Sequence, residues 1–157
     1  MLRAIRWGVF KWGYDITLDG RPLTELSGIR RESCEFVVGG VAYFIARDGR
    51  KHFTLSGPKG RVADATRETG RQWAITSAEG RTDLVKPSVW RSGWEVRRGG
   101  AAGAIGREGM FTRAYAANVP AGVSLPVQVF VLYVLLMIFA RQQAAASSGG
   151  AVGAASG

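Results

Sequence analysis

The sequence predicts a mainly β protein, built as an antiparallel meander, with one hydrophobic α-helix near its C-terminus. Three observations support this prediction. Short alternating apolar runs separated by glycine-containing turns fill the chain from Asp15 to Tyr115. No segment of that region keeps a helical period over about ten residues between breakers, which argues against a βαβ fold. A single long apolar run then extends from Leu125 to Ala140.

The turns of the β region are marked by glycine. Asp19-Gly20 separates two short apolar runs, which is a strong hairpin signal because glycine adopts positive φ without steric cost. Gly39-Gly40 shifts the phase of the next alternating run by one residue, as a bulge or a tight turn does. Later turn glycines recur at a spacing close to the about 8–12 residues that are typical of an antiparallel sandwich or barrel. These are Gly49, Gly60, Gly70, Gly80, Gly93, Gly100 and Gly109.

The apolar run contains no charged residue and no glycine. Pro126 suits the first turn of a helix and Arg141 suits the last, so we expect a helix over about residues 126–141. Because this helix is apolar on every side, it must be enclosed by protein or by lipid. It would span about 24 Å, against about 30 Å for a bilayer core. On physical grounds alone, burial inside a β-barrel and insertion as a tail anchor are equal alternatives.

The two ends of the chain are expected to be separate segments. Residues 1–14 are basic and aromatic, and their cations interrupt the apolar stretch that a secretory signal needs, so we expect a cytoplasmic start. This segment is either a first strand or short helix that covers the core, or a basic helix that lies on an anionic membrane. Residues 15–141 form the β domain with its helix. Residues 142–157, rich in Ala, Ser and Gly, are expected to be a disordered tail.

The composition excludes several kinds of site. A single cysteine, Cys34, and a single histidine, His52, exclude a disulfide framework and a His/Cys zinc site within one chain. No nucleophile elbow accompanies His52, so we expect a solvated surface histidine. Gly100, Gly103 and Gly106 lack the strand–loop–helix context of a nucleotide-binding loop and instead predict a turn and closely packed strands. We therefore expect no catalytic residue, no metal and no cofactor.

Basic residues are the remaining functional signal. The formal net charge is +9, and no charged residue follows Arg141. Cations beside the predicted turns can converge at one end of the β domain and form an anion site. Lipid phosphates would suit such a site. Nucleic acid would suit it too, with Trp7, Trp12 or Trp90 as stacking platforms, and in a third interpretation the cations only solvate the turns. The candidates are Arg30, Arg31, Arg47, Arg50, Lys51, Lys59, Arg61, Arg97 and Arg98.

Five short segments follow one another in a characteristic order, ending in Leu-Pro and then a hydrophobic helix. They are Phe53–Ala65, Trp73–Ile75, Trp94–Val96, Gly103–Arg107 and Leu125–Phe130. In this order they resemble the tubby C-terminal-like superfamily, in particular its small LURP-one-related and phospholipid-scramblase-like branch. The resemblance covers the chain from about Phe36 to Arg141.

The resemblance implies an antiparallel β-barrel meander that encloses the hydrophobic C-terminal α-helix. Better-known members bind phosphoinositides or associate with membranes, and none is an established metabolic enzyme. The chain is shorter than a full twelve-stranded member, so we expect some strands to be missing or short. It also lacks a cysteine cluster for acylation and an Asp-rich calcium loop, so calcium-driven lipid scrambling is not expected. The central residues of the helix are then Val127, Phe130, Val131, Val134, Leu135 and Ile138.

We therefore expect a non-enzymatic, monomeric barrel at the cytoplasmic face of a membrane, bound to anionic phospholipid head groups or to a protein partner. One alternative is a tail-anchored, single-span membrane protein with a cytoplasmic β domain. The other is a nucleic-acid-binding barrel.

Overall fold

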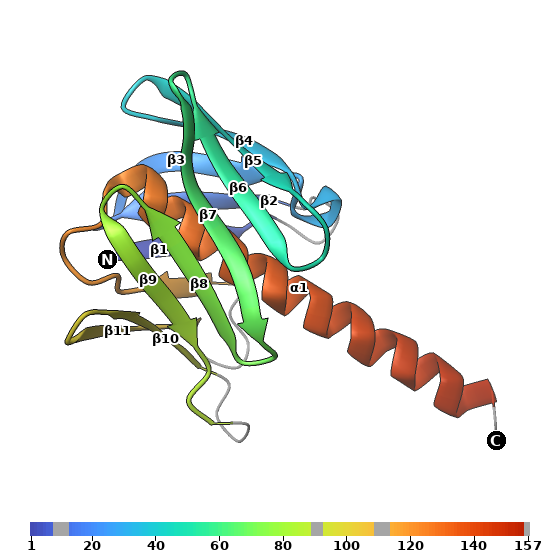
Figure 1. The fold of residues 1–157 in the computed structure, drawn as a ribbon. Coiled ribbons are helices and arrows are strands. Elements are labelled where there is room, and N and C mark those ends of the chain that lie inside the picture. The colour runs from blue at the N-terminus through green and yellow to red at the C-terminus, as the bar shows by residue number, and fades with distance from the viewer. Residues whose placement is uncertain (8–12, 89–92, 109–113, 156–157) are drawn as a thin grey trace.

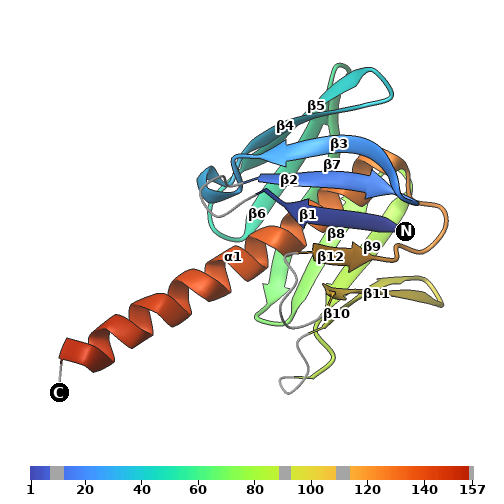
Figure 2. The same cartoon turned by 180° about the vertical axis from the view of Figure 1, so that it is seen from behind.

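The computed structural model describes residues 1–7, 13–88, 93–108 and 114–155 of the chain (Figures 1 and 2). A short 3-10 helix, η1, spans Ile29–Arg31, and a long α-helix, α1, spans Leu125–Ala155. The strands in these residues are β1 (Leu2–Arg6), β2 (Gly13–Leu18), β3 (Arg21–Ser27), β4 (Cys34–Val38), β5 (Val41–Arg47), β6 (His52–Gly57), β7 (Gly60–Thr69), β8 (Gln72–Ser77), β9 (Gly80–Val85), β10 (Trp94–Arg98), β11 (Ala101–Arg107) and β12 (Ala114–Ala117).

The strands form a single antiparallel sheet that curls into a nearly closed barrel. Their order is β3-β2-β1-β12-β11-β10-β9-β8-β7-β6-β5-β4. The two outermost strands, β3 and β4, face each other without a ladder, and the Val37 N–H donates to Thr24 Oγ1 (3.3 Å) across this seam. The predicted mainly β, antiparallel barrel with one C-terminal helix is confirmed.

The inner wall alternates large and small side chains. Phe53 on β6 and Ile75 on β8 both lie opposite Ala65 on β7, and all three side chains are buried. Inward residues recur at every second position along each strand, so the register fixes which side chains face the axis. Small residues between large ones leave space along that axis for a helix.

Glycine allows one especially close approach in the wall. A Cβ atom built on Gly103 of β11 would lie 1.7 Å from the backbone oxygen of Asn118. Only glycine therefore lets β11 pack against the chain that follows β12. Gly100 lies in the turn between β10 and β11. The prediction of a turn and of closely packed strands is confirmed at these two positions.

The hydrophobic helix lies inside the barrel. From Val127 to Ile138, the described apolar side chains of α1 are at most 7% exposed. The predicted central residues are all among them. By length and composition, Leu125–Ser147 could cross a membrane, yet 61% of its most apolar window is buried. The wall of the barrel therefore supplies the enclosure that an all-round apolar helix requires.

The helix is longer than the sequence suggested. It continues to Ala155 rather than ending at Arg141, and the described side chains of residues 142–147 are exposed. The expected disordered tail is thus a helical extension that leaves the barrel (Figure 1). The disorder prediction considered only how little surface this segment can bury. Residues 142–146 are Gln and Ala, which have high helix propensity, so the helix propagates through them from the buried part of α1. Propensity does not explain its continuation through the serines and glycines that follow.

The N-terminal segment belongs to the barrel. β1 lies between β2 and β12 in the sheet, so the expected boundary after residue 14 falls inside β2. Leu2 and Ala4 are buried in the core, which corrects the membrane-helix interpretation for Leu2–Arg6. The described residues also contain twelve strands. The expectation was of missing or short strands. None of the twelve is missing, because β1 and β12 complete the barrel, but β12 is short, with 4 residues.

Removing α1 should unfold the barrel, because the wall would then face an empty axis. Burial of one large apolar side chain stabilises by ~1.5–3 kcal/mol, whereas a whole domain is stable by only ~5–15 kcal/mol. A chain that ends at Ser124 should therefore show no cooperative thermal transition by circular dichroism. A chain that ends at Gln143 is the control, and its melting temperature should stay close to that of the full chain. A folded, soluble product ending at Ser124 would contradict enclosure and favour the tail anchor.

Replacing Tyr133 by Phe should stabilise the protein. The Tyr133 side chain is 0% exposed, and its hydroxyl has no hydrogen-bond partner among the described residues. Losing an unsatisfied buried hydroxyl should raise the free energy of unfolding by ~1 kcal/mol in a urea titration at pH 7. Tyr133→Ala, which leaves a cavity, should instead cost ~3–5 kcal/mol.

The difference in stability between Tyr133→Phe and the wild type should grow at alkaline pH. Burial raises the pKa of Tyr133 well above its ordinary value, and burial raises the pKa of Tyr14 to about 12. The unfolded state therefore loses these protons first, and stability should fall as pH rises above about 10. Tyr133→Phe should show a shallower fall than the wild type in urea titrations at increasing pH. Identical slopes would contradict the burial of the phenol.

Candidate functional site

The antiparallel meander gives the barrel two chemically different ends. α1 begins beside the turn that joins β8 to β9, where the Ser124 N–H donates to Glu79 Oε2 (2.7 Å), and Figure 1 shows this start near the N-terminus. We call this the helix-start end. α1 leaves at the opposite end, where η1 and the turns 48–51 and 70–71 lie. We call this the helix-exit end.

The predicted basic candidates divide between the two ends. Arg97 lies on the outer wall, on β10. Arg98 donates to the backbone oxygen of Glu79 at the helix-start end, so its guanidinium holds a turn in place. The structure therefore places only some of these cations at a common end of the barrel. Arg30, Arg31, Arg47, Arg50 and Lys51 lie at the helix-exit end, whereas Lys59, Arg61 and Arg98 lie at the helix-start end.

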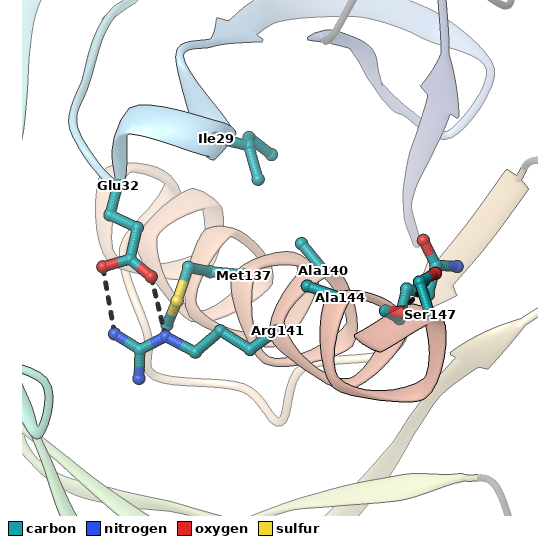
Figure 3. Close-up of a pocket in the computed structure, with 8 residues that line it drawn as sticks. Ile29, Glu32, Met137, Ala140, Arg141, Ala144 and Ser147 are labelled. Atoms are coloured by element: carbon teal, nitrogen blue, oxygen red, sulfur yellow. Dashed lines mark hydrogen bonds and ion pairs between the residues drawn. The ribbon is translucent and has the colours of Figure 1, made fainter. Parts of the chain in front are cut away.

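Glu32 is the centre of the helix-exit end. Its carboxylate accepts hydrogen bonds from Arg141 Nε (2.7 Å) and Arg141 Nη2 (3.1 Å), as Figure 3 shows. It also accepts one from Arg47 Nη1 (2.7 Å). The Arg141 guanidinium also lies 5.4 Å from the ring centroid of Phe53, a cation–π contact. The hydrogen bonds from Arg141, together with Arg47, hold the pKa of Glu32 below its usual range despite partial burial.

Local backbone geometry positions this carboxylate. η1 starts after Gly28, whose φ of 72° places it in the left-handed region. A Cβ atom there would lie 2.4 Å from the backbone oxygen of Ser33, so glycine is required at this point. Glu32 ends η1 with a φ of 55°, and its N–H donates to the Ile29 carbonyl (3.1 Å). The tight loop turns the Glu32 side chain toward α1, as Figure 3 shows.

The turn between β5 and β6 presents free cations on a fixed backbone. Arg141 Nη1 donates to the Arg50 carbonyl (2.7 Å), and the Arg67 N–H donates to the Lys51 carbonyl (2.8 Å). The side chains of Arg31, Arg50 and Lys51 are exposed and make no ion pair within the described part of the chain. We call these three residues the basic rim. Because its neighbour Glu32 is already neutralised by Arg47 and Arg141, the rim keeps its positive charge.

A groove of about 510 Å³ lies between η1 and the emerging helix. Ile29, Met137 and Ala140 form its apolar side, and the Glu32–Arg141 pair forms its polar side (Figure 3). The groove contains no unpartnered charge, since its acid and its base bind each other. The Glu32–Arg141 pair therefore closes the mouth of the barrel, and the groove offers no reactive group.

The remaining candidate chemistry is structural. His52 is 27% exposed, with Nδ1 3.3 Å from Asp48 and Nε2 3.1 Å from Asp64, so it is held between two carboxylates and is less solvated than expected. Burial raises the pKa of the Cys34 thiol, which disfavours the reactive thiolate. In the residues that the structure describes, no group of three or more His, Cys, Asp or Glu side chains is placed to hold a metal.

The proposed stacking residues are not confirmed. Trp7 Nε1 donates to Asp15 Oδ1 (2.6 Å), and its ring packs against Gly13. It is therefore partly covered and not a free platform. Trp12 and Trp90 lie outside the described residues.

Sequence reasoning missed Glu32, the centre of the helix-exit end. Glu32 follows Arg30 and Arg31 beside a predicted turn, with no motif around it. The role of Glu32 depends on Arg141, from which 109 sequence positions separate it. Only the closed barrel brings Glu32 and Arg141 together, so no local sequence signal could have identified the role of Glu32.

No protein-family model, curated protein or solved structure matches this chain.

Replacing Glu32 by Gln should destabilise the protein at neutral pH. The side chain of Glu32 is 14% exposed and pairs with two guanidinium groups, so the loss should be ~2 kcal/mol in a urea titration. Because the folded-state pKa of Glu32 is lowered, its contribution is present above about pH 4.3 and is lost as pH falls through the folded pKa. The difference between the variant and the wild type should therefore shrink at acidic pH.

Glu68→Gln is the matched control, since Glu68 pairs with Arg81 (2.8 Å) in an exposed position. An exposed pair contributes little to stability, so this variant should unfold like the wild type. Equal losses for the two variants would contradict a special role for the Glu32 cluster.

Proposed function

We propose that this chain is a small tubby-like β-barrel, without catalytic activity, that binds anionic lipid head groups at the cytoplasmic face of a membrane. The observation that supports this most is the basic rim of Arg31, Arg50 and Lys51 at the helix-exit end. The order of the strands, their number in the described residues and the enclosed C-terminal helix support the proposed superfamily.

The electrostatics of the rim suit a charged surface better than a small ligand. Its side chains are exposed and project from two connections, η1 and the turn 48–51. Each Lys or Arg near an anionic membrane contributes ~1 kcal/mol, and salt screens the attraction over about 8 Å at physiological ionic strength. A few such cations give weak, reversible and salt-sensitive binding.

The helical extension leaves the barrel at the same end as the rim (Figure 2). No charged residue follows Arg141 in the sequence. An uncharged helix can enter the interfacial region without desolvating a charge, so the rim and the extension can approach one membrane together. The site also leaves room for a protein partner with an acidic surface.

The tail-anchored alternative keeps one supporting observation, namely the length and composition of Leu125–Ser147. Insertion would have to withdraw Val127–Ile138 from the barrel and expose the inner wall. Carbonate extraction of membranes distinguishes the two, because a true span stays in the pellet whereas a peripheral barrel is released. Nucleic acid is less favoured, because Trp7, the one proposed stacking residue that lies in the described part of the chain, is partly covered and bonded to Asp15.

Reversing two charges of the rim should strongly weaken vesicle binding. The double variant Arg50→Glu with Lys51→Glu should sediment with phosphatidylserine-containing vesicles at least about tenfold less well than the wild type at low salt. The matched control is Lys59→Glu with Arg61→Glu, which makes the same charge change at the helix-start end and should bind normally.

Equal losses for both double variants would show that only net charge matters, which contradicts a defined rim. Failure of the wild type to bind at low salt would contradict lipid binding altogether. Oligonucleotides added in a parallel titration test the nucleic-acid alternative, which predicts a steep salt dependence.

A further inference from the structure

A second basic feature lies on the outer wall of the barrel, apart from the basic rim. It is a shallow pocket of about 410 Å³ lined by Arg71, Lys86 and Arg97, with Thr69 and Gln72 as polar neighbours. No acidic residue lines this pocket. The three cations come from three connected elements: the turn after β7, the chain after β9, and β10.

Backbone hydrogen bonds hold the pocket in shape. The Lys86 N–H donates to the Arg71 carbonyl (2.9 Å), which extends the β8–β9 ladder by one bond beyond the pair Gln72 and Val85. The Arg71 N–H donates to Thr69 Oγ1 (3.2 Å), which fixes the turn and the hydroxyl. The register of β10 against β9 then sets Arg97 on the neighbouring strand.

The charge of the pocket is largely uncompensated. Within the described residues, Arg71 and Lys86 form no ion pair. The Arg97 guanidinium forms an ion pair with Glu95 (2.8 Å), and Glu95 is not part of the pocket lining. Arg71 and Lys86 therefore repel each other without a counter-charge among the described residues, and a bound anion would relieve this repulsion.

We propose that this pocket binds a phosphate monoester. Such a group carries about −1.5 to −2 charges at pH 7 and presents three strong acceptor oxygens. Those oxygens match one lysine, two arginines, a hydroxyl and an amide, whereas a carboxylate offers only one charge and two oxygens. The pocket volume of about 410 Å³ is many times the about 30 Å³ that one water molecule occupies in the liquid. The pocket therefore has room for the phosphate and for the group esterified to it. The phosphate can belong to a soluble metabolite or to a lipid such as phosphatidic acid.

This proposal goes beyond the membrane surface proposed above, because it requires a discrete site and not a general attraction to negative charge. It is tested first in solution, without vesicles. Titration of the full-length protein with glycerol phosphate, followed by amide NMR, should give saturable shifts centred on residues 69–72 and 85–86. Lys86→Gln should weaken this binding about tenfold, as expected for the loss of one charge-assisted hydrogen bond.

Lys59→Gln makes the same substitution at the helix-start end and should leave the affinity unchanged. Arg71→Gln is a second pocket variant, which guards against a folding defect in the first. Absence of saturable binding, or equal weakening by Lys59→Gln and Lys86→Gln, would overturn the proposal.

Vesicles then identify the source of the phosphate. If lipid supplies it, Lys86→Gln should reduce binding to phosphatidic acid vesicles and leave binding to phosphatidylserine vesicles unchanged. If a soluble ester supplies it, glycerol phosphate should bind while both vesicle types respond equally in the variant and the wild type. Because the solution titration does not depend on membranes, failure of the pocket and failure of the basic rim give different results.

Discussion

The burial of an all-round apolar helix is the constraint on which the rest of the structure depends. Such a helix has a diameter of about 10–12 Å with its side chains, and no face of it tolerates water. A flat sheet covers one face only, so the wall must curve around the helix. The antiparallel meander does this with short hairpins, and residues such as Ala65 leave space where Phe53 and Ile75 reach inward. The wall and the helix therefore depend on each other.

The end of this enclosure determines where polar chemistry appears. Ile138 is still buried, and Arg141 one turn later meets Glu32 at the mouth of the barrel. Glu32 binds both Arg141 and Arg47, so these two guanidinium groups serve stability. Arg50 contributes its carbonyl to the same cluster while its side chain stays outside. Neighbouring cations thus have different roles. The paired side chains of Arg47 and Arg141 close the barrel, whereas the unpaired side chain of Arg50 faces solvent.

The fold was largely predictable because its signals are local. Turn glycines, alternating strands and the uncharged run Leu125–Ala140 each report on neighbouring residues. The role of Leu2–Arg6 was ambiguous, since its cations suit a strand or an amphipathic helix, and only pairing with β12 decides. The site was predictable only in part. The sequence shows which cations flank turns, but the end of the barrel that each turn occupies follows from the strand count before it. One undetected strand, such as β1, reverses that assignment.

The seam between β3 and β4 is the part of the barrel where pairing with another chain must be avoided. An unpaired strand edge is a template for pairing with another chain. Here Pro22 has no N–H to offer, Glu25 and Glu35 are exposed on the two seam strands, and Thr24 Oγ1 accepts the hydrogen bond from the Val37 N–H. Val37 and Phe44 remain about half exposed on the outer surface of the β4–β5 hairpin. Because like charges flank this edge, a second copy that approached it would bring carboxylates together. The barrel can therefore remain incompletely hydrogen-bonded and still resist edge-to-edge pairing, since the enclosed helix, rather than the seam, holds the two edges together.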